Sequence, residues 1–479
     1  MNNSKTNWGV AFSSFRITSF FIRLLPIILT LYILFRISLN LINESLWYDE
    51  AMQFWISFGC NPDQIKINNG LDEVIDLNQK FNHDPGGFSL LLHFWLNISQ
   101  ELKWIRLLPL LFFLGSIIVV FLTIQSLFKD KRISFICALI PFLSDTLLYF
   151  STEIRAYSME CLCSSFAILA ICTLNQQKSL CKILLCSIML SFLMTSRYSA
   201  MITSALSMIV IISSWSTKLR PNFFVRVSFM IIPFILIAST AYLFSLSLQN
   251  PSIKTPSYVD LSFEFNILNL IIFFIPLGCI VFFDRSDDRR IFYVSIYVTL
   301  LNLTFVALAL LEIHPADLWS KYCIGLLFGN IVLYIIVFAK VLSSNNDQKW
   351  SSIFLAVLAL GILLQHNSLS MRANQNFFDP QELFKLSGKK IYVDRSLSPT
   401  LKYLTTFGSA TKWKTLEENE IFFQKQIYHT LGSDRLFLGN DNIEKIDLSH
   451  YDLLIAPESI INDDISSWVK VSNYVYQKN

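Results

Sequence analysis

Acidic, basic and histidine side chains gather in a few short polar segments that separate the long apolar runs of this chain. Asp49 and Glu50 are adjacent in Ser-Leu-Trp-Tyr-Asp-Glu-Ala, and His83 and Asp84 precede Pro-Gly-Gly. The later candidates are Glu153, Arg155, Tyr157, Arg197, His314, Lys321 and Tyr322. Carboxylates can take a proton from a hydroxyl group, and fixed cations can stabilise a departing phosphate. These residues are therefore candidates for acid–base catalysis and for phosphate binding.

Each candidate also has an ordinary explanation. A single acid such as Asp49 can be a solvated loop residue, and Arg155 and Lys321 can anchor helix ends at lipid headgroups. Gly86 and Gly87 can serve only to turn the chain into the helix that follows. The elements that must position these residues therefore have to be considered next.

The composition is that of a membrane protein. Of the 479 residues, 53% are hydrophobic and 15% are charged, and the mean hydropathy is +0.49. Soluble domains carry about 25% charged residues, and disordered chains combine low hydrophobicity with high charge. The net charge of +3, without a basic tract, gives no sign of a nucleic-acid partner.

Eleven apolar runs approach or exceed the length of a membrane-spanning helix, which needs roughly 17–25 residues. They are Leu24–Ile42, Ile105–Phe128, Ile133–Phe150, Ala156–Leu174, Leu180–Thr195, Ala200–Trp215, Val227–Leu248, Leu268–Phe283, Ile291–Leu311, Ile324–Val341 and Trp350–Leu364. Because no small-residue cleavage site follows the first run, we expect it to be an uncleaved anchor.

A further apolar run, Phe88–Asn97, is too short to span comfortably. Its Phe88, Leu91, Leu92 and Trp95 recur at helical spacing, which is typical of an amphipathic helix at the membrane interface. With this run at the interface, most loop Lys and Arg residues fall on the side of the N-terminus. The short loops of the opposite side then hold Arg155, Arg197, Lys254 and Lys321. The positive-inside rule thus predicts a cytoplasmic N-terminus.

The predicted topology gives two parts. Residues 1–365 form a transmembrane domain with a long first external loop at about 43–104, and residues 366–479 form a small extracytoplasmic α/β domain. In the latter, Lys390–Val393 and Tyr451–Ala456 have the pattern of short buried strands, and Ser398–Phe407 that of a helix with proline in its first turn.

This topology brings the candidate carboxylates, imidazoles and cations to the external mouths of the spans, at the depth of a lipid headgroup. A site there could transfer a group from a lipid-linked phosphate. The reaction needs a carboxylate that accepts the proton of an acceptor hydroxyl group, and cations or a metal ion that stabilise the leaving phosphate.

At these residues the chain resembles the GT-C superfamily of membrane glycosyltransferases, in the branch of the protein O-mannosyltransferases and aminoarabinose transferases. The acidic motif at Asp49-Glu50 opens the first external loop, as in that family. His83-Asp84-Pro85 with Leu90–Leu96 resembles "H-P-P-L-Y-Y-L-L-L-H-L-W", and Arg106–Pro109 resembles "R-L-P-S". Glu153–Tyr157 resembles "Q-E-A-R-x-Y", and Lys321-Tyr322 stands where "R-Y" is usual.

The resemblance implies transfer of a sugar from a polyprenyl-phosphate donor to an acceptor hydroxyl group on the extracytoplasmic face, with inversion at the anomeric carbon. Asp49 would be the base with Glu50 beside it, and Arg155 and Lys321 would hold the phosphate. The remaining substrate-binding candidates are His83, Asp84, Glu153, Tyr157, Arg197, His314 and Tyr322. The acceptor is a lipid, a glycan or a protein, and the expected location is a bacterial inner membrane. Members of the family differ in metal dependence, so a divalent cation such as Mg²⁺ or Mn²⁺ stays open.

Asp84-Pro85-Gly86-Gly87 departs from the family pattern, and Lys321 replaces an arginine, which removes bidentate phosphate geometry while keeping the charge.

Three other function classes stay open. A transporter or flippase of lipid-linked glycans predicts paired broken helices, a polymerase or ligase predicts a large late external loop, and a non-catalytic scaffold leaves the clustered charges without a cause.

Overall fold

The computed structural model describes most of the apolar part of the chain and short stretches of the C-terminal region. The described residues are 26–41, 46–60, 70–82, 84–174, 179–216, 222–241, 275–281, 289–311, 321–343, 390–393, 399–401, 403, 420–423, 429–431, 434–436, 453–455, 468–472 and 475–478.

Within these residues, five helices are long and apolar enough to cross a membrane: α5 (Leu102–Phe128), α8 (Tyr157–Leu174), α10 (Tyr198–Ser216), α11 (Phe223–Ala241) and α13 (Arg289–Leu310). Shorter apolar helices are Pro26–Leu41, α4 (Gly87–Leu96), α9 (Leu180–Leu193) with the 3-10 turn η2 (Met194–Ser196), and α14 (Ile324–Ser343), which follows η4 (Lys321–Cys323). The chain is thus a predominantly α-helical membrane protein.

Helix α8 lies at the centre of the bundle. It contacts α5, α9, α10, α13 and α14 and is the most buried of the five long helices. Its small residues, such as Ala167 and Ala170, are fully enclosed, which allows close helix packing in an apolar environment. The polar end of α8 is therefore surrounded by other elements.

The prediction of one continuous helix over Ile133–Phe150 is wrong. The structure has α6 (Lys131–Leu139), the 3-10 turn η1 (Ile140–Leu143) and α7 (Asp145–Phe150) in this stretch. Pro141 has no N–H group for an α-helical hydrogen bond, which weakens the helix at this point. The hydroxyl group of Ser144 then accepts the N–H group of Leu147 and caps the start of α7.

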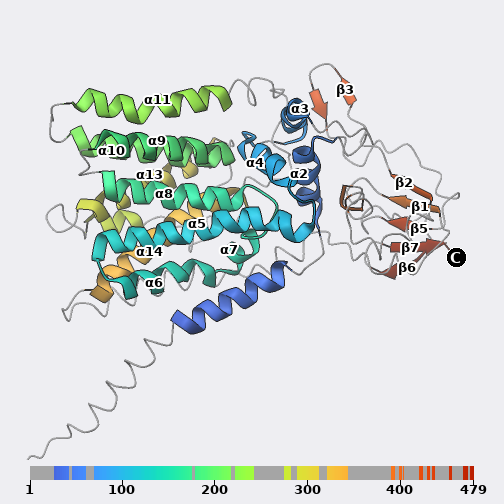
Figure 1. Ribbon diagram of the computed structural model, residues 1–479, viewed down its shortest axis with the longest axis horizontal. Coiled ribbons are helices and arrows are strands. Elements are labelled where there is room, and N and C mark those ends of the chain that lie inside the picture. The colour runs from blue at the N-terminus through green and yellow to red at the C-terminus, as the bar shows by residue number, and fades with distance from the viewer. Residues whose placement is uncertain are drawn as a thin grey trace, which may run out of the picture.

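Three short helices lie together at one end of the long helices (Figure 1): α2 (Tyr48–Phe58), α3 (Leu71–Phe81) and α4. Helix α2 ends at Gly59, which has a left-handed backbone and whose N–H group returns to the carbonyl of Ile56. Helix α4 begins after Gly86, whose φ of 92° suits glycine. The predicted short helix at Phe88–Asn97 is confirmed as α4, and we call this end of the bundle the α2–α4 end.

A five-stranded mixed sheet lies beyond the α2–α4 end (Figure 1), with strand order β2-β1-β5-β7-β6. The strands are β1 (Lys390–Val393), β2 (Glu420–Phe423), β5 (Leu453–Ile455), β6 (Trp468–Ser472) and β7 (Val475–Lys478), and β3 (His429–Leu431) pairs with β4 (Asp434–Leu436) separately. Strand β1 is parallel to β2 and β5, and β7 is antiparallel to its neighbours. The strands predicted at Lys390–Val393 and Tyr451–Ala456 are present as β1 and β5.

Several predicted spans extend beyond the described residues. The span Trp350–Leu364 lies entirely outside them, and of Leu268–Phe283 only the helix at 275–281 lies within. The same holds for the end of Val227–Leu248 and for part of the predicted helix Ser398–Phe407, whose described residues 399–401 and 403 are helical.

Candidate functional site

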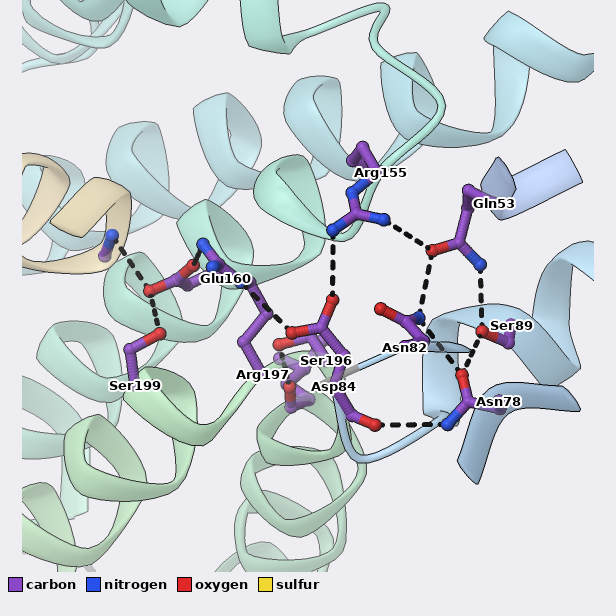
Figure 2. Close-up of polar contacts among 12 residues, drawn as sticks. Gln53, Asn78, Asn82, Asp84, Ser89, Arg155, Glu160, Ser196, Arg197 and Ser199 are labelled. Carbon is purple, nitrogen blue, oxygen red and sulfur yellow. Dashed lines mark hydrogen bonds and ion pairs between the residues drawn. The ribbon is translucent and has the colours of Figure 1, made fainter. Parts of the chain in front are cut away.

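Four segments meet at the α2–α4 end and bring most of the candidate residues together: the start of α2, the turn before α4, the turn at 151–156 before α8, and the residues just before α10. Figure 2 shows Gln53 of α2 together with Asp84, Arg155 and Arg197, whose polar groups face one another. Segments separated by more than a hundred residues in the sequence thereby form one polar cluster.

Asp84 lies between two arginines at the centre of this cluster (Figure 2). Its Oδ1 is 3.4 Å from Nε of Arg197, and its Oδ2 is 3.9 Å from a guanidinium nitrogen of Arg155. The side chain of Asp84 is 12% exposed, so both ion pairs lie in a largely desolvated place.

The two glycines after Asp84 fix the turn that carries it. A Cβ atom on Gly87 would clash with the hydroxyl oxygen of Thr195, so this turn packs directly against η2. The carbonyl of Asp84 accepts an N–H of the Asn78 side chain at 3.1 Å. The glycine pair therefore does more than start a helix. Because Gly87 has no side chain, the Asp84 turn can pack closely against the segment that leads to Arg197.

Arg197 is held by a second, fully buried carboxylate. Its guanidinium donates to Oε2 of Glu160 at 3.1 Å, while Ser199 and the N–H group of Gly325 donate to Oε1 at 2.6 and 3.1 Å. Glu160 belongs to the first turns of α8 and is 0% exposed. Burial opposes the charge of Arg197, but Glu160 and Asp84 outweigh burial and raise its pKa above its ordinary value.

Two tyrosine rings complete the surroundings of Arg197. Its guanidinium carbon is 4.9 Å from the ring centre of Tyr157 and 5.8 Å from that of Tyr322. Both distances fall within the range of cation–π contacts. Because it contacts two carboxylates and two rings, Arg197 has the surroundings of a fixed structural cation.

Arg155 is less tightly engaged. Besides its 3.9 Å contact with Asp84, it donates to Oε1 of Gln53 at a long 3.5 Å, and within the described part of the chain its buried Nε has no hydrogen-bond partner. Burial opposes its charge, but Tyr157, Asp49 and Asp84 together raise the pKa of Arg155. Arg155 is therefore a permanent cation whose guanidinium can donate further hydrogen bonds.

A network of amide and hydroxyl groups lies beside Arg155 and Asp84 (Figure 2). Gln53 donates to Ser89 at 2.8 Å and accepts from Asn82 at 3.2 Å, and Asn78 accepts from both Ser89 and Asn82. Because each member has its partners, the network orients Gln53 and Asn78, which contact Arg155 and Asp84 in turn.

The two adjacent acids of α2 have different surroundings. Asp49 is partly exposed and lies near enough to Arg155 to act on its charge. Glu50 is buried: its Oε1 accepts the N–H group of Ile154 at 3.0 Å, and its Oε2 is 3.6 Å from Arg106. Burial raises the pKa of Glu50, and Arg106 opposes that rise. Glu50 thus joins α2 to the 151–156 turn.

The remaining candidates are placed as follows. Glu153 is buried in the 151–156 turn, and Tyr157 opens α8. The backbone of Lys321 lies in η4 beside Tyr322, whereas the side chain of Lys321 and the whole of His83 and His314 lie outside the described residues.

An apolar groove with a cavity volume of about 510 Å³ adjoins the polar cluster. It is lined by apolar side chains of α3, α4, α9 and α11, among them Val74, Leu91, Phe94, Phe192 and Ala241, and Asn78 and Ser89 of the amide network lie on its wall. The side chain of Phe94 is 59% exposed, so the groove opens to the outside of the helix bundle.

Sequence reasoning missed Glu160, Gln53 and Asn78. A signal for Glu160 was present, since an acid inside an apolar membrane helix is expensive and is usually functional or paired. For Gln53 and Asn78 no such signal exists, because amide side chains are common in loops and helices of every kind.

No group of three or more His, Cys, Asp and Glu side chains that could hold a metal ion occurs among the described residues.

Comparisons with known proteins give no match to this chain, either among protein-family models or among curated proteins.

Proposed function

We propose that this membrane protein is a glycosyltransferase that moves a sugar from a polyprenyl-phosphate donor to an acceptor hydroxyl group. One observation carries the proposal: a buried acid–arginine cluster adjoins an apolar groove that opens to the side of the helix bundle. A lipid-linked phosphate needs both parts, since its chain requires an apolar surface and its headgroup requires fixed cations.

The donor would lie with its phosphate at Arg155 and its prenyl chain along the groove. Arg155 suits the phosphate because its guanidinium keeps unused donor capacity and stays charged at every working pH. Lys321 is a second cation for the phosphate by its position in the sequence. Arg197 positions Asp84 and does not contact the donor in this proposal.

Asp49 is the proposed base. It takes the proton of the acceptor hydroxyl group while the acceptor oxygen bonds to the anomeric carbon and the bond from that carbon to the phosphate oxygen breaks. Displacement from the face opposite the phosphate inverts the anomeric carbon. The leaving polyprenyl phosphate keeps its negative charge beside Arg155. Glu50 and Asp84 hold the surrounding segments.

The membrane arrangement belongs to the same proposal. Eleven spans would place the N-terminus in the cytoplasm and the cluster on the extracytoplasmic face, with residues 366–479 as an α/β domain on that face. The predominance of Lys and Arg in the opposite loops supports this orientation, and a bacterial inner membrane is the proposed location.

The test uses purified protein, a panel of polyprenyl-phosphate sugars and a membrane extract as the acceptor source, with release of polyprenyl phosphate as the readout. Wild-type protein should release it, and Asp49→Asn should lose most of the activity because the amide cannot accept the proton. The matched control is Asp76→Asn in α3, whose carboxylate is exposed and pairs with Lys80. It should retain wild-type activity.

Two results would contradict the proposal. Full activity in Asp49→Asn would show that the base is another residue. Absence of release by the wild-type protein with every donor would refute glycosyl transfer from these donors, and flipping of lipid-linked sugars in vesicles would then be measured.

A further inference from the structure

Helix α2, which carries Asp49 and Glu50, is hydrogen-bonded to the C-terminal region. The indole Nε1 of Trp55 donates to the carbonyl of Pro399 at 2.9 Å, and that indole is buried. The hydroxyl group of Tyr403 donates to the carbonyl of Gln100 at 2.9 Å, just before α5. Residues some 300 positions apart in the sequence are thus joined around α2.

Apolar packing strengthens this contact. Leu401 and Tyr403 are almost fully buried in the same cluster as Leu46 and Phe54. The rings of Phe54 and Tyr403 meet edge to face, with centroids 4.7 Å apart and planes at 77°, which is a favourable aromatic geometry. The C-terminal residues therefore fill part of the core behind α2.

The same contact reaches the buried ion pair behind the candidate base. The charges of Glu50 and Arg106 both act on the phenol of Tyr403, and burial raises the pKa of that phenol, so it stays a neutral donor at pH 7. Glu50 in turn joins α2 to the 151–156 turn through the N–H group of Ile154. Tyr403 thus lies close to the ion pair that joins α2 to the 151–156 turn.

We propose that residues 399–401 and 403 are positioning residues for the transfer reaction, because they hold α2 where Asp49 can act. This inference rests on the proposed function and extends it: the C-terminal region is part of the scaffold of the transmembrane site and not a separate appendage.

Two tryptophans provide a matched comparison. Trp215, near the end of α10, donates its Nε1 to the carbonyl of Leu174 at 2.9 Å and is as buried as Trp55. It lies 18 residues after Arg197, or about 27 Å along the helix. Trp55→Phe therefore removes an indole hydrogen bond near the site, and Trp215→Phe removes the same kind of hydrogen bond far from it.

The experiment measures the melting temperature (Tm) and, per folded enzyme after size-exclusion chromatography, the kcat and donor KM of both full-length variants. Both should show similar losses of Tm. Trp55→Phe should lose at least about tenfold in kcat with donor KM within about twofold, since a misplacement of about 1 Å can cost 10²-fold. Trp215→Phe should keep both constants. Equal kcat values in the two variants would overturn the inference.

A double-mutant cycle separates this inference from the proposed function. Phe54→Leu, Tyr403→Leu and the double variant are compared by Tm, which needs no activity, while Tyr403→Phe keeps the ring and should rescue most of the loss. Non-additive shifts in Tm support the contact, and additive shifts overturn the inference. If the cycle is non-additive but the wild-type protein releases no polyprenyl phosphate, the proposed function fails, and the catalytic part of this inference with it.

Discussion

Replacing Gly325 by alanine should impair the candidate site without changing any of its side chains. Gly325 lies in the first turn of α14, and its N–H group donates to Oε1 of Glu160 at 3.1 Å. A Cβ atom at this position would lie 2.6 Å from that oxygen and 3.1 Å from the hydroxyl oxygen of Ser164. Because an ordinary van der Waals contact begins at 3.4 Å, the carboxylate must retreat by about 0.8 Å.

Such a retreat changes the position of Arg197, because Glu160 holds it at 3.1 Å and both side chains are buried. Overpacking of this kind costs about 1–3 kcal/mol, and a displacement of about 1 Å in a site can cost up to 10²-fold in rate. Gly325→Ala should therefore lower Tm and reduce kcat for polyprenyl-phosphate release by about 10- to 100-fold.

Gly329→Ala is the control, one turn further along α14. Its Cβ atom would meet only the end of the Leu301 side chain, at 3.4 Å, so kcat and Tm should stay close to the wild-type values. The two variants are compared by release of polyprenyl phosphate and by thermal unfolding in detergent. If Gly325→Ala matched Gly329→Ala in both measurements, Glu160 would not set the position of Arg197 and the reasoning would be refuted.

Two further predictions concern the charged residues. Arg155→Lys keeps the charge but loses the planar donor pair, so donor KM should rise about tenfold, and Arg155→Gln should raise it further; equal KM values in steady-state kinetics would contradict phosphate binding by Arg155. For Glu50, burial raises the pKa in the folded protein above the ordinary value of 4.5, so the folded state favours the protonated acid and stability is lost as pH rises through the raised pKa. The Tm of the wild-type protein should therefore fall relative to that of Glu50→Gln as the pH rises above 4.5, and a constant difference would show that Glu50 has the same pKa in the folded and unfolded states.

The helices could be predicted from the sequence where one physical signal dominates. The long apolar run at Ile105–Phe128 and the helical spacing of Phe88, Leu91, Leu92 and Trp95 are such signals, and both segments are helical in the structure. Hydropathy does not predict the break in the third expected span, because the whole run is apolar and the break depends on Pro141 and on the capping hydroxyl group of Ser144.

The site was predictable only in part, for a related reason. The motifs singled out Asp84, Arg155 and Arg197, and the structure brings these three together. Motifs do not reveal pairing between distant segments, however. The ion pair of Glu50 with Arg106 and the contact of Glu160 with Gly325 join segments 56 and 165 residues apart, and such contacts depend on how the helices pack.

The two sides of the cluster are supported by different parts of the chain, and they meet at Asp84. On one side, Glu160 ties Arg197 to the start of α14. On the other side, α2 joins Arg155 through Gln53 and rests on the C-terminal residues through Trp55. Since Asp84 contacts both arginines, a displacement on either side changes the same carboxylate. Gly325→Ala and Trp55→Phe should consequently be less than additive in kcat when combined, because each already disturbs the position of Asp84.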